Sequence, residues 1–174
     1  MKHIIKFFAV ILFVFLSTNS FAEQKVVVLD MKLVLNTSKA GKGAQDYLQK
    51  SFKDNQKKFT DMENKLKKDE NDLLNQKTNI TKEEYTKKSD NLRKKVIDYQ
   101  SQRRSSLDKI AKQRAEARKA LLEKITPILD NYIKENNVSI VIDKKNVIGG
   151  DATLDITDVI IEKLNKELPS LNLK

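Results

Sequence analysis

Residues that commonly carry chemistry are scarce in this chain of 174 residues. It contains no cysteine and a single histidine, His3, close to the N-terminus. Thiolate metal sites, cysteine nucleophiles and disulfides are therefore excluded, and a serine–histidine–aspartate triad would have only this one imidazole to use. We expect no catalytic residue, no metal site and no cofactor, and we consider an enzyme the least favoured class.

Two short patterns could suggest ligand sites. The segment Ala40–Ala44 contains a Gly-Lys pair, but it lacks the glycine spacing and the following Ser or Thr of a phosphate-binding loop. The acids Asp143, Asp151, Asp155 and Asp158 do not follow the spacing of a calcium-binding loop. Capping and turn roles explain these carboxylates more simply.

Residues 1–22 have the composition of a secretory signal peptide. Lys2 and Lys6 form a basic start, an apolar run of ten residues follows, and small residues precede the boundary between Ala22 and Glu23. We predict cleavage at this boundary and export of a soluble protein to the periplasm. The alternative is an N-terminal membrane anchor, although the apolar run is about half of the ~20 residues that span a bilayer.

The excess positive charge lies in the middle of the chain. Residues 38–119 contain 23 Lys and Arg and 13 Asp and Glu, whereas the rest of the predicted mature chain has 9 basic and 11 acidic residues. A field of this kind attracts acidic partners and weakens with salt, since the Debye length is ~8 Å at physiological ionic strength. The alternative is that these charges only solvate a long helix.

A long stretch without glycine, between Gly43 and Gly149, predicts long helices. Apolar residues recur in its first part at steps of three and four, as in a coiled coil. This first stripe consists of Ala44, Leu48, Phe52, Asn55, Phe59, Met62, Leu66, Asp69 and Leu73.

A second helix is predicted to begin at Thr81–Glu84, which matches a capping box. We therefore predict an antiparallel helical hairpin over residues 38–136, with a turn near residues 75–81 and with the base of the second helix joining the body. Pro127 should kink the second helix or begin a new segment. The second stripe consists of Tyr85, Leu92, Val96, Tyr99, Leu107, Ile110, Ala117, Leu121, Ile125, Ile128 and Tyr132, with Arg103 and Arg114 interrupting it.

The two ends, residues 23–37 and 137–174, are predicted to form a small body. Short β-branched runs predict strands at 25–30 and 139–143, with a possible third at 146–149. The fold class is thus α+β and mostly α, with a coiled-coil arm on a β-rich body too small to stand alone, so we expect oligomerisation. A short helix opening at Asp155 would present Ile156, Val159, Ile160 and Leu164 as its apolar face.

Motifs near both ends of the chain resemble those of a known family. These are Lys25–Met31 and Ser38–Ala44 at the front, and Leu122–Pro127, Val141–Val147 and Asp151–Asp158 at the back. In order and spacing they resemble the Skp/OmpH periplasmic chaperones. The resemblance extends from Lys25 to about Leu168; Gly149-Gly150 departs from it, and Pro169–Lys174 extends past it.

The resemblance implies a homotrimer in which three hairpins project from a shared β-rich body around a cavity. Members of this family hold unfolded outer-membrane β-barrel proteins there without ATP, in transit to the outer membrane, and have no catalytic residues. The residues expected in the trimer body are Val26, Val28, Ile140, Ile142, Val147, Ile156, Val159, Ile160 and Leu164.

For client binding we name apolar and cationic candidates on the arm. The hypothesis is that the lower arm is packed while Phe52, Phe59 and their neighbours partly line the cavity. Packing is expected to be looser, and the arm able to bend, where the stripe is broken by Asn55, Asp69, Arg103 and Arg114. The alternatives are that the apolar candidates form only coiled-coil core and that the cations form only a solvated face. The candidates are Phe52, Phe59, Met62, Tyr85, Val96, Tyr99, Lys57, Lys58, Lys65, Lys67, Lys68, Lys87, Lys88, Arg93, Lys94 and Lys95.

The sequence also fits other partners and other classes of protein. Basic clusters at Arg103-Arg104 and Lys112–Arg118 could contact the phosphates of lipopolysaccharide or an anionic membrane surface. A pI of 9.6 also fits nucleic-acid binding, although no base-reading module is present and export separates the chain from nucleic acid. A further class is a structural coiled-coil adaptor of the cell envelope, which would dock tightly through the hairpin tip.

Overall fold

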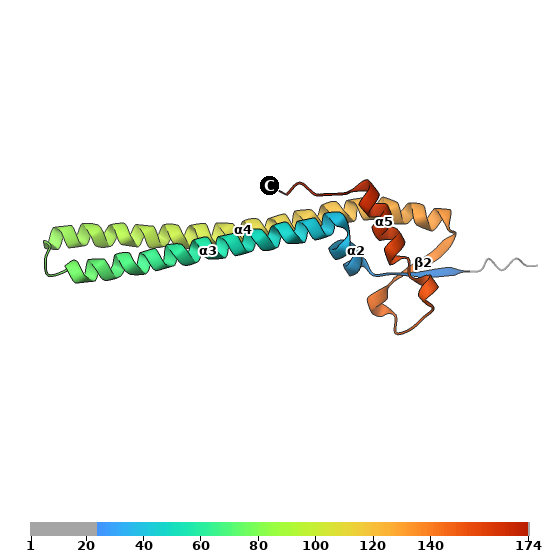
Figure 1. Ribbon diagram of the computed structural model, residues 1–174, viewed down its shortest axis with the longest axis horizontal. Coiled ribbons are helices and arrows are strands. Elements are labelled where there is room, and N and C mark those ends of the chain that lie inside the picture. The colour runs from blue at the N-terminus through green and yellow to red at the C-terminus, as the bar shows by residue number, and fades with distance from the viewer. Residues whose placement is uncertain (1–23, 174) are drawn as a thin grey trace, which may run out of the picture.

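Two long helices lie side by side and antiparallel along most of the molecule (Figure 1). The structure is a computed structural model and describes residues 24–173. Helix α3 spans Lys39–Gln76 and helix α4 spans Lys82–Glu135, which are 38 and 54 residues long. At ~1.5 Å per residue α3 extends about 57 Å, and α4 continues past its base into the body. The predicted signal segment and its cleavage site lie outside the described residues.

The hairpin tip is defined by the hydrogen bonds that begin α4. Thr81 Oγ1 accepts a hydrogen bond from Glu84 N at 3.2 Å, and Glu84 Oε2 accepts one from Thr81 N at 3.2 Å. This is the predicted capping box, and it satisfies two backbone donors that a helix start would leave unpaired. Lys77 N donates to Leu74 O at 3.2 Å and closes α3, so the connection spans only residues 77–81.

The body is built on two parallel strands. Strand β1, Lys25–Leu29, pairs with strand β2, Val138–Asp143, with Val26 opposite Ile140. Parallel neighbours require a long crossover connection, and here the entire helical hairpin is that crossover. The strand pair therefore fixes both ends of the arm in one small body.

A hydrophobic core forms where helix α2, Met31–Thr37, the base of α4 and helix α5, Thr157–Glu167, meet one face of the sheet. Side chains alternate along β1, so Val27 and Leu29 enter this core while Val26 and Val28 face the other way. Each fully buried aliphatic side chain contributes ~1.5–3 kcal/mol through removal from water. The most deeply buried members are Ile125, Ile160, Leu164, Val27 and Val34.

Helix α2, Met31–Thr37, is an element that the sequence analysis misses, since it assigns only a strand to residues 23–37. Asp30 Oδ1 accepts a hydrogen bond from Leu33 N at 2.8 Å and so caps the first turn. Asp30 N in turn donates to Thr157 Oγ1 at 2.9 Å. The aspartate that ends the strand therefore also begins a helix and ties it to α5.

Ser38 separates α2 from α3 and turns the chain onto the arm. Ser38 N donates to Val34 O at 3.3 Å, and Ser38 Oγ accepts from Gly41 N at 3.2 Å. The turn is so tight that a Cβ on Gly41 would lie 2.0 Å from Leu35 O. Only glycine fits at this position.

The predicted third strand at residues 146–149 is wrong. Beyond β2, Asp143 Oδ1 accepts a hydrogen bond from Lys145 N at 3.1 Å and turns the chain away from the sheet. The free edge of β1 is met instead by Ile156 N, which donates to Val28 O at 2.9 Å, so the described residues hold a two-stranded sheet. Two 3₁₀ helices, Lys144–Asn146 and Ala152–Leu154, occupy the connection.

Helices α5 and α4 differ from expectation in one detail each. Val159 is 42% exposed, so it is not part of the apolar face that α5 buries in this chain. Helix α4 is continuous through Pro127, and the alternative in which this proline begins a new segment is wrong. Ile125 and Ile128, on either side of the proline, are both buried in the core and hold the helix across the lost hydrogen bond.

Candidate functional site

Two surfaces of the molecule carry the features expected of a binding protein: the helical arm and the outer face of the sheet. Within residues 24–173, no cluster of three or more His, Asp or Glu could hold a metal ion. No helix in the described part of the chain has both the length and the apolar content needed to cross a membrane.

Most of the apolar candidates lie along the seam between α3 and α4. Phe59 is 7% exposed, and its ring meets that of Tyr99 edge to face with centroids 6.0 Å apart. Met62, Tyr85 and Val96 are half-buried in the same seam. An edge-to-face pair adds about 0.5–1.5 kcal/mol beyond area burial, so these residues hold the arm together.

Phe52 behaves differently from the other apolar candidates. Its side chain is 49% exposed, near the base of the arm. The structure thus separates two phenylalanines of the same predicted stripe, since Phe59 packs inside the arm while Phe52 remains accessible.

In the middle of the seam, the residues of α4 that are buried differ from those predicted. Gln113 is only 4% exposed and Ser106 is half-buried, whereas Leu107 is exposed. The expectation that Arg114 interrupts the stripe is therefore wrong, because the buried position between Ile110 and Ala117 belongs to Gln113. Gln113 Nε2 donates to the hydroxyl of Tyr47 at 3.5 Å, a polar contact that hydrophobic periodicity cannot detect.

Polar residues mark two other points of the seam. A cavity of about 520 Å³ opens beside Asn55 and is lined on α4 by Ser101, Gln102, Ser105 and Ser106. Farther toward the tip, the half-buried Asp69 forms an ion pair with Lys95 of α4. The seam is apolar at its ends and partly polar between them.

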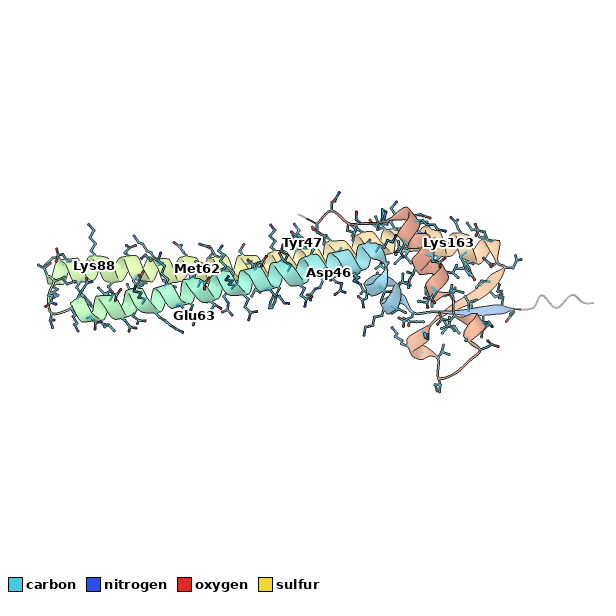
Figure 2. The ribbon with its side chains drawn as sticks, viewed as in Figure 1. Asp46, Tyr47, Met62, Glu63, Lys88 and Lys163 are labelled. Carbon is cyan, nitrogen blue, oxygen red and sulfur yellow. The ribbon has the colours of Figure 1, made fainter. Side chains whose placement is uncertain are left out.

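The basic side chains project outward along both helices of the arm (Figure 2). Some have local partners: Lys67 Nζ lies 2.8 Å from Glu63 Oε1, and Lys88 Nζ donates to Gln76 Oε1 at 2.6 Å. The hydrogen bond from Lys67, with its positive charge, lowers the pKa of Glu63. Arg93 pairs with Asp90, and Lys95 with Asp69. The candidates without an ion pair in the described residues are Lys57, Lys58, Lys65, Lys68, Lys87, Lys88 and Lys94.

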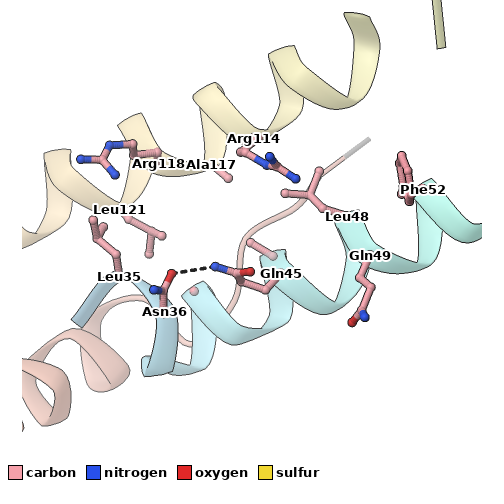
Figure 3. Close-up of a pocket in the computed structure, with 12 residues that line it drawn as sticks. Leu35, Asn36, Gln45, Leu48, Gln49, Phe52, Arg114, Ala117, Arg118 and Leu121 are labelled. Atoms are coloured by element: carbon pink, nitrogen blue, oxygen red, sulfur yellow. Dashed lines mark hydrogen bonds between the residues drawn. The ribbon is translucent and has the colours of Figure 1, made fainter. Parts of the chain in front are cut away.

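A groove of about 550 Å³ lies at the base of the arm, where the junction of α2 and α3 faces α4 (Figure 3). Its wall includes a hydrogen bond from Gln45 Nε2 to Asn36 Oδ1 at 2.6 Å. The remaining lining residues are Leu35, Gly41, Ala44, Leu48, Gln49, Phe52, Arg114, Ala117, Arg118 and Leu121.

The outer face of the sheet is the second surface. Val26 and Val28 on β1 lie opposite Ile140 and Ile142 on β2, and Ile140 is 51% exposed. Exposed Val159 and Ile148, and half-buried Val147, add further apolar area to the body. The other residues expected in the trimer body, Ile156, Ile160 and Leu164, are buried in the core of the chain itself.

The fold and these surfaces define a class of protein in which a helical hairpin arm stands on a small mixed body. The family model described as "Outer membrane protein (OmpH-like)" matches residues 25–164. The chain therefore belongs to the OmpH-like family, which confirms the resemblance and the fold class expected from the sequence.

A solved structure from Caulobacter crescentus CB15, described as a candidate outer membrane chaperone (OmpH-like), has a similar fold. The two superpose with a TM-score of 0.79 over 90% of this chain and 92% of the other, at 17% sequence identity. Likeness at this identity concerns the fold alone. None of the curated proteins compared matches the chain.

Proposed function

We propose that this protein is an ATP-independent holdase chaperone of the periplasm, exported by its predicted signal peptide. In this role it catalyses no reaction. It binds unfolded outer-membrane β-barrel proteins between helical arms and prevents their aggregation on the way to the outer membrane. The observation that carries the proposal is the arm itself, a hairpin of about 57 Å that leaves the body and exposes most of its basic side chains.

A holdase must bind many sequences weakly and release them without an energy source, so broad and shallow contact suits it better than a deep pocket. Exposed lysines supply long-range attraction for acidic segments, and this attraction weakens with salt. The basic clusters at Arg103-Arg104 and Lys112–Arg118 are the groups that would contact lipopolysaccharide phosphates or an anionic membrane surface. The half-exposed Phe52 supplies an apolar contact of the kind an unfolded chain would seek.

We further propose that three chains assemble through the outer face of the sheet. Val26, Val28, Ile140 and Ile142 form an apolar patch that one chain leaves partly exposed, with Ile140 the most accessible. Exposed apolar patches of this kind mark association sites, and a body this small gains stability by sharing its core. Trimerisation would place three arms around one cavity.

Light scattering after dilution of a urea-unfolded outer-membrane β-barrel protein tests the proposal. With the mature chain from Glu23 present, we expect scattering to be suppressed at about three chains per client, as a closed trimer requires, and less so at high salt. Bovine serum albumin at equal mass serves as the control for nonspecific protection. Unchanged scattering with a folded, helical chain would contradict the holdase and favour the envelope adaptor.

A further inference from the structure

We propose that the groove at the base of the arm binds a carboxylate that lies beside a large apolar side chain in an unfolded polypeptide. This inference deepens the proposed function and rests on it, because it names a chemical feature that the arm would select in its clients. It concerns the groove of Figure 3 and is independent of the general positive charge of the arm.

The floor of the groove is apolar and its depth comes from small residues. Ala44 on α3 and Ala117 on α4 are both buried, and they stand where larger side chains would fill the space between the helices. Leu48 and Leu121 complete the floor. The resulting space of about 550 Å³ suits one or two side chains and is too small for the several acyl chains of a lipid anchor.

Two guanidinium groups stand beside this floor. Arg114 and Arg118 are one helical turn apart on α4, so both lie on the face that lines the groove. Figure 3 shows the Arg114 guanidinium extending toward Leu48, while the Arg118 side chain lies along α4 at the rim of the groove. Within residues 24–173 neither arginine forms an ion pair, and Glu116, which lies between them in sequence, is instead 3.9 Å from Lys112.

The lining contains no Asp or Glu, so the groove is charge-complementary to an anion. A guanidinium presents parallel N–H donors that match the two oxygens of a carboxylate, which a lysine ammonium does not. Phe52 adds an exposed aromatic wall at the outer end. An apolar floor, an aromatic wall and two unpaired guanidiniums together favour a segment with both an apolar side chain and a carboxylate.

The proposal is tested with short fluorescein-labelled glycine–serine peptides and the complete mature chain, by fluorescence anisotropy. One peptide ends in phenylalanine with a free carboxylate, a second is its C-terminal amide, and a third ends in alanine with a free carboxylate. A fourth carries an internal Asp-Phe pair and an amidated end. We expect the first to bind about tenfold more tightly than the second, which loses one charge-assisted hydrogen bond. A loss of about tenfold is also expected for the third, which keeps the carboxylate but lacks the large apolar side chain.

The fourth peptide distinguishes the source of the carboxylate. Tight binding of both the first and the fourth peptides means that side-chain carboxylates are accepted, and tight binding of the first alone means that chain ends are selected. Equal binding of the first and second peptides overturns the proposal. So does binding of phosphatidylglycerol vesicles that depends on Arg114 and Arg118 when no peptide shows a carboxylate preference, since the groove would then be a lipid site.

Substitutions inside and outside the groove test whether the carboxylate preference arises there. R114Q/R118Q should abolish the carboxylate preference, whereas R104Q/K124Q, with the same charge loss on α4 but outside the groove, should keep it. R114K/R118K retains the charge and loses the planar fork, so an intermediate loss of about threefold is expected. F52A should remove the preference for phenylalanine over alanine. Equal losses in the two glutamine variants would show bulk attraction only and overturn the proposal.

The groove and the holdase activity can fail separately. Suppressed scattering with no carboxylate preference rejects the groove and leaves the holdase in place. A carboxylate preference that R114Q/R118Q abolishes, together with unchanged scattering, rejects the holdase and leaves the groove as a peptide site.

Discussion

Lys95 Nζ on α4 lies 2.7 Å from Asp69 Oδ2 on α3, at a point where the seam of the arm carries a carboxylate instead of an apolar side chain. The hydrogen bond from Lys95 holds the pKa of Asp69 below its usual value. A charged residue in the stripe is therefore matched by a cation from the facing helix, and the pair links the two helices toward the tip.

A double-mutant cycle measures this link. Both side chains are partly exposed, so the coupling between Asp69→Asn and Lys95→Met should be about 0.5 kcal/mol in the free energy of unfolding. It should shrink in high salt because exposed charges are screened. Urea unfolding followed by circular dichroism at constant protein concentration gives the value. A coupling several times larger and insensitive to salt would contradict this account of the seam.

The two phenylalanines of the first stripe should differ in their effects. Phe59→Ala removes a buried ring that packs on Tyr99 and should lower the free energy of unfolding by about 3 kcal/mol. Phe52→Ala removes a half-exposed ring and should change stability by less than about 1 kcal/mol, while weakening client capture in the scattering assay. The same unfolding and scattering measurements serve both variants. Equal destabilisation by the two substitutions would mean that Phe52 is also part of the packed seam.

Two neighbouring glycines provide a matched pair at the start of the arm. In Gly41→Ala the new Cβ would lie 2.0 Å from Leu35 O, a backbone atom that cannot move aside, so we expect a loss of about 3 kcal/mol. In Gly43→Ala the new Cβ meets nothing within 4 Å, and the helix should gain about 0.5–1 kcal/mol. Thermal unfolding of the two variants tests the opposite signs. A stable Gly41→Ala variant would refute the tight turn at Ser38.

Asp155 should make the stability of the body depend on pH. Burial acts to raise the pKa of this carboxyl, but hydrogen bonds from Lys144 and Thr157 outweigh it and leave the pKa lowered. The ionised Asp155 therefore stabilises the fold fully when the pH is above the unfolded-state pKa of about 3.9. This stabilisation is lost as the pH falls through the lower pKa of the folded state. Asp155→Asn should lower the free energy of unfolding by about 1 kcal/mol near neutral pH. In acid, the free energies of unfolding of the variant and the wild type should converge.

Urea unfolding at a series of pH values checks the convergence. Asp130→Asn removes an exposed carboxylate of α4 and should stay within about 0.5 kcal/mol of the wild type near neutral pH. If the gap between Asp155→Asn and the wild type stayed constant from neutral to acid pH, the carboxylate would not be the origin of the stabilisation.

The proposed trimer depends on the outer face of the sheet. Ile140→Lys places a charge among Val26, Val28 and Ile142 and should convert trimers to monomers. Ile97→Lys introduces the same charge at an exposed position of the arm and should leave the assembly unchanged. Size-exclusion chromatography with multi-angle light scattering gives the mass of each. A trimeric Ile140→Lys variant would place the interface elsewhere.

The arm was largely predictable because its determinants are local. The spacing of Leu48, Phe59 and Leu73 identifies one face of a helix, and the capping box at Thr81 identifies where α4 begins. Local periodicity fails in the middle of the seam, since Gln113 is buried through contacts with the facing helix and its polarity hides this. The predicted roles of individual arm residues in client binding remain predictions.

The sequence by itself determined the hairpin, its tip, its positive charge and the class of the fold, because these follow from helical periodicity, capping and composition. Only the tertiary structure decided what lies at the base. Helix α2 depends on Asp30, whose backbone N–H bonds Thr157 more than a hundred residues away, and the edge of β1 is taken by Ile156 instead of residues 146–149. The groove beside Arg114 and Arg118 likewise exists only where three helices meet, and contacts between distant segments leave no periodic pattern in a sequence.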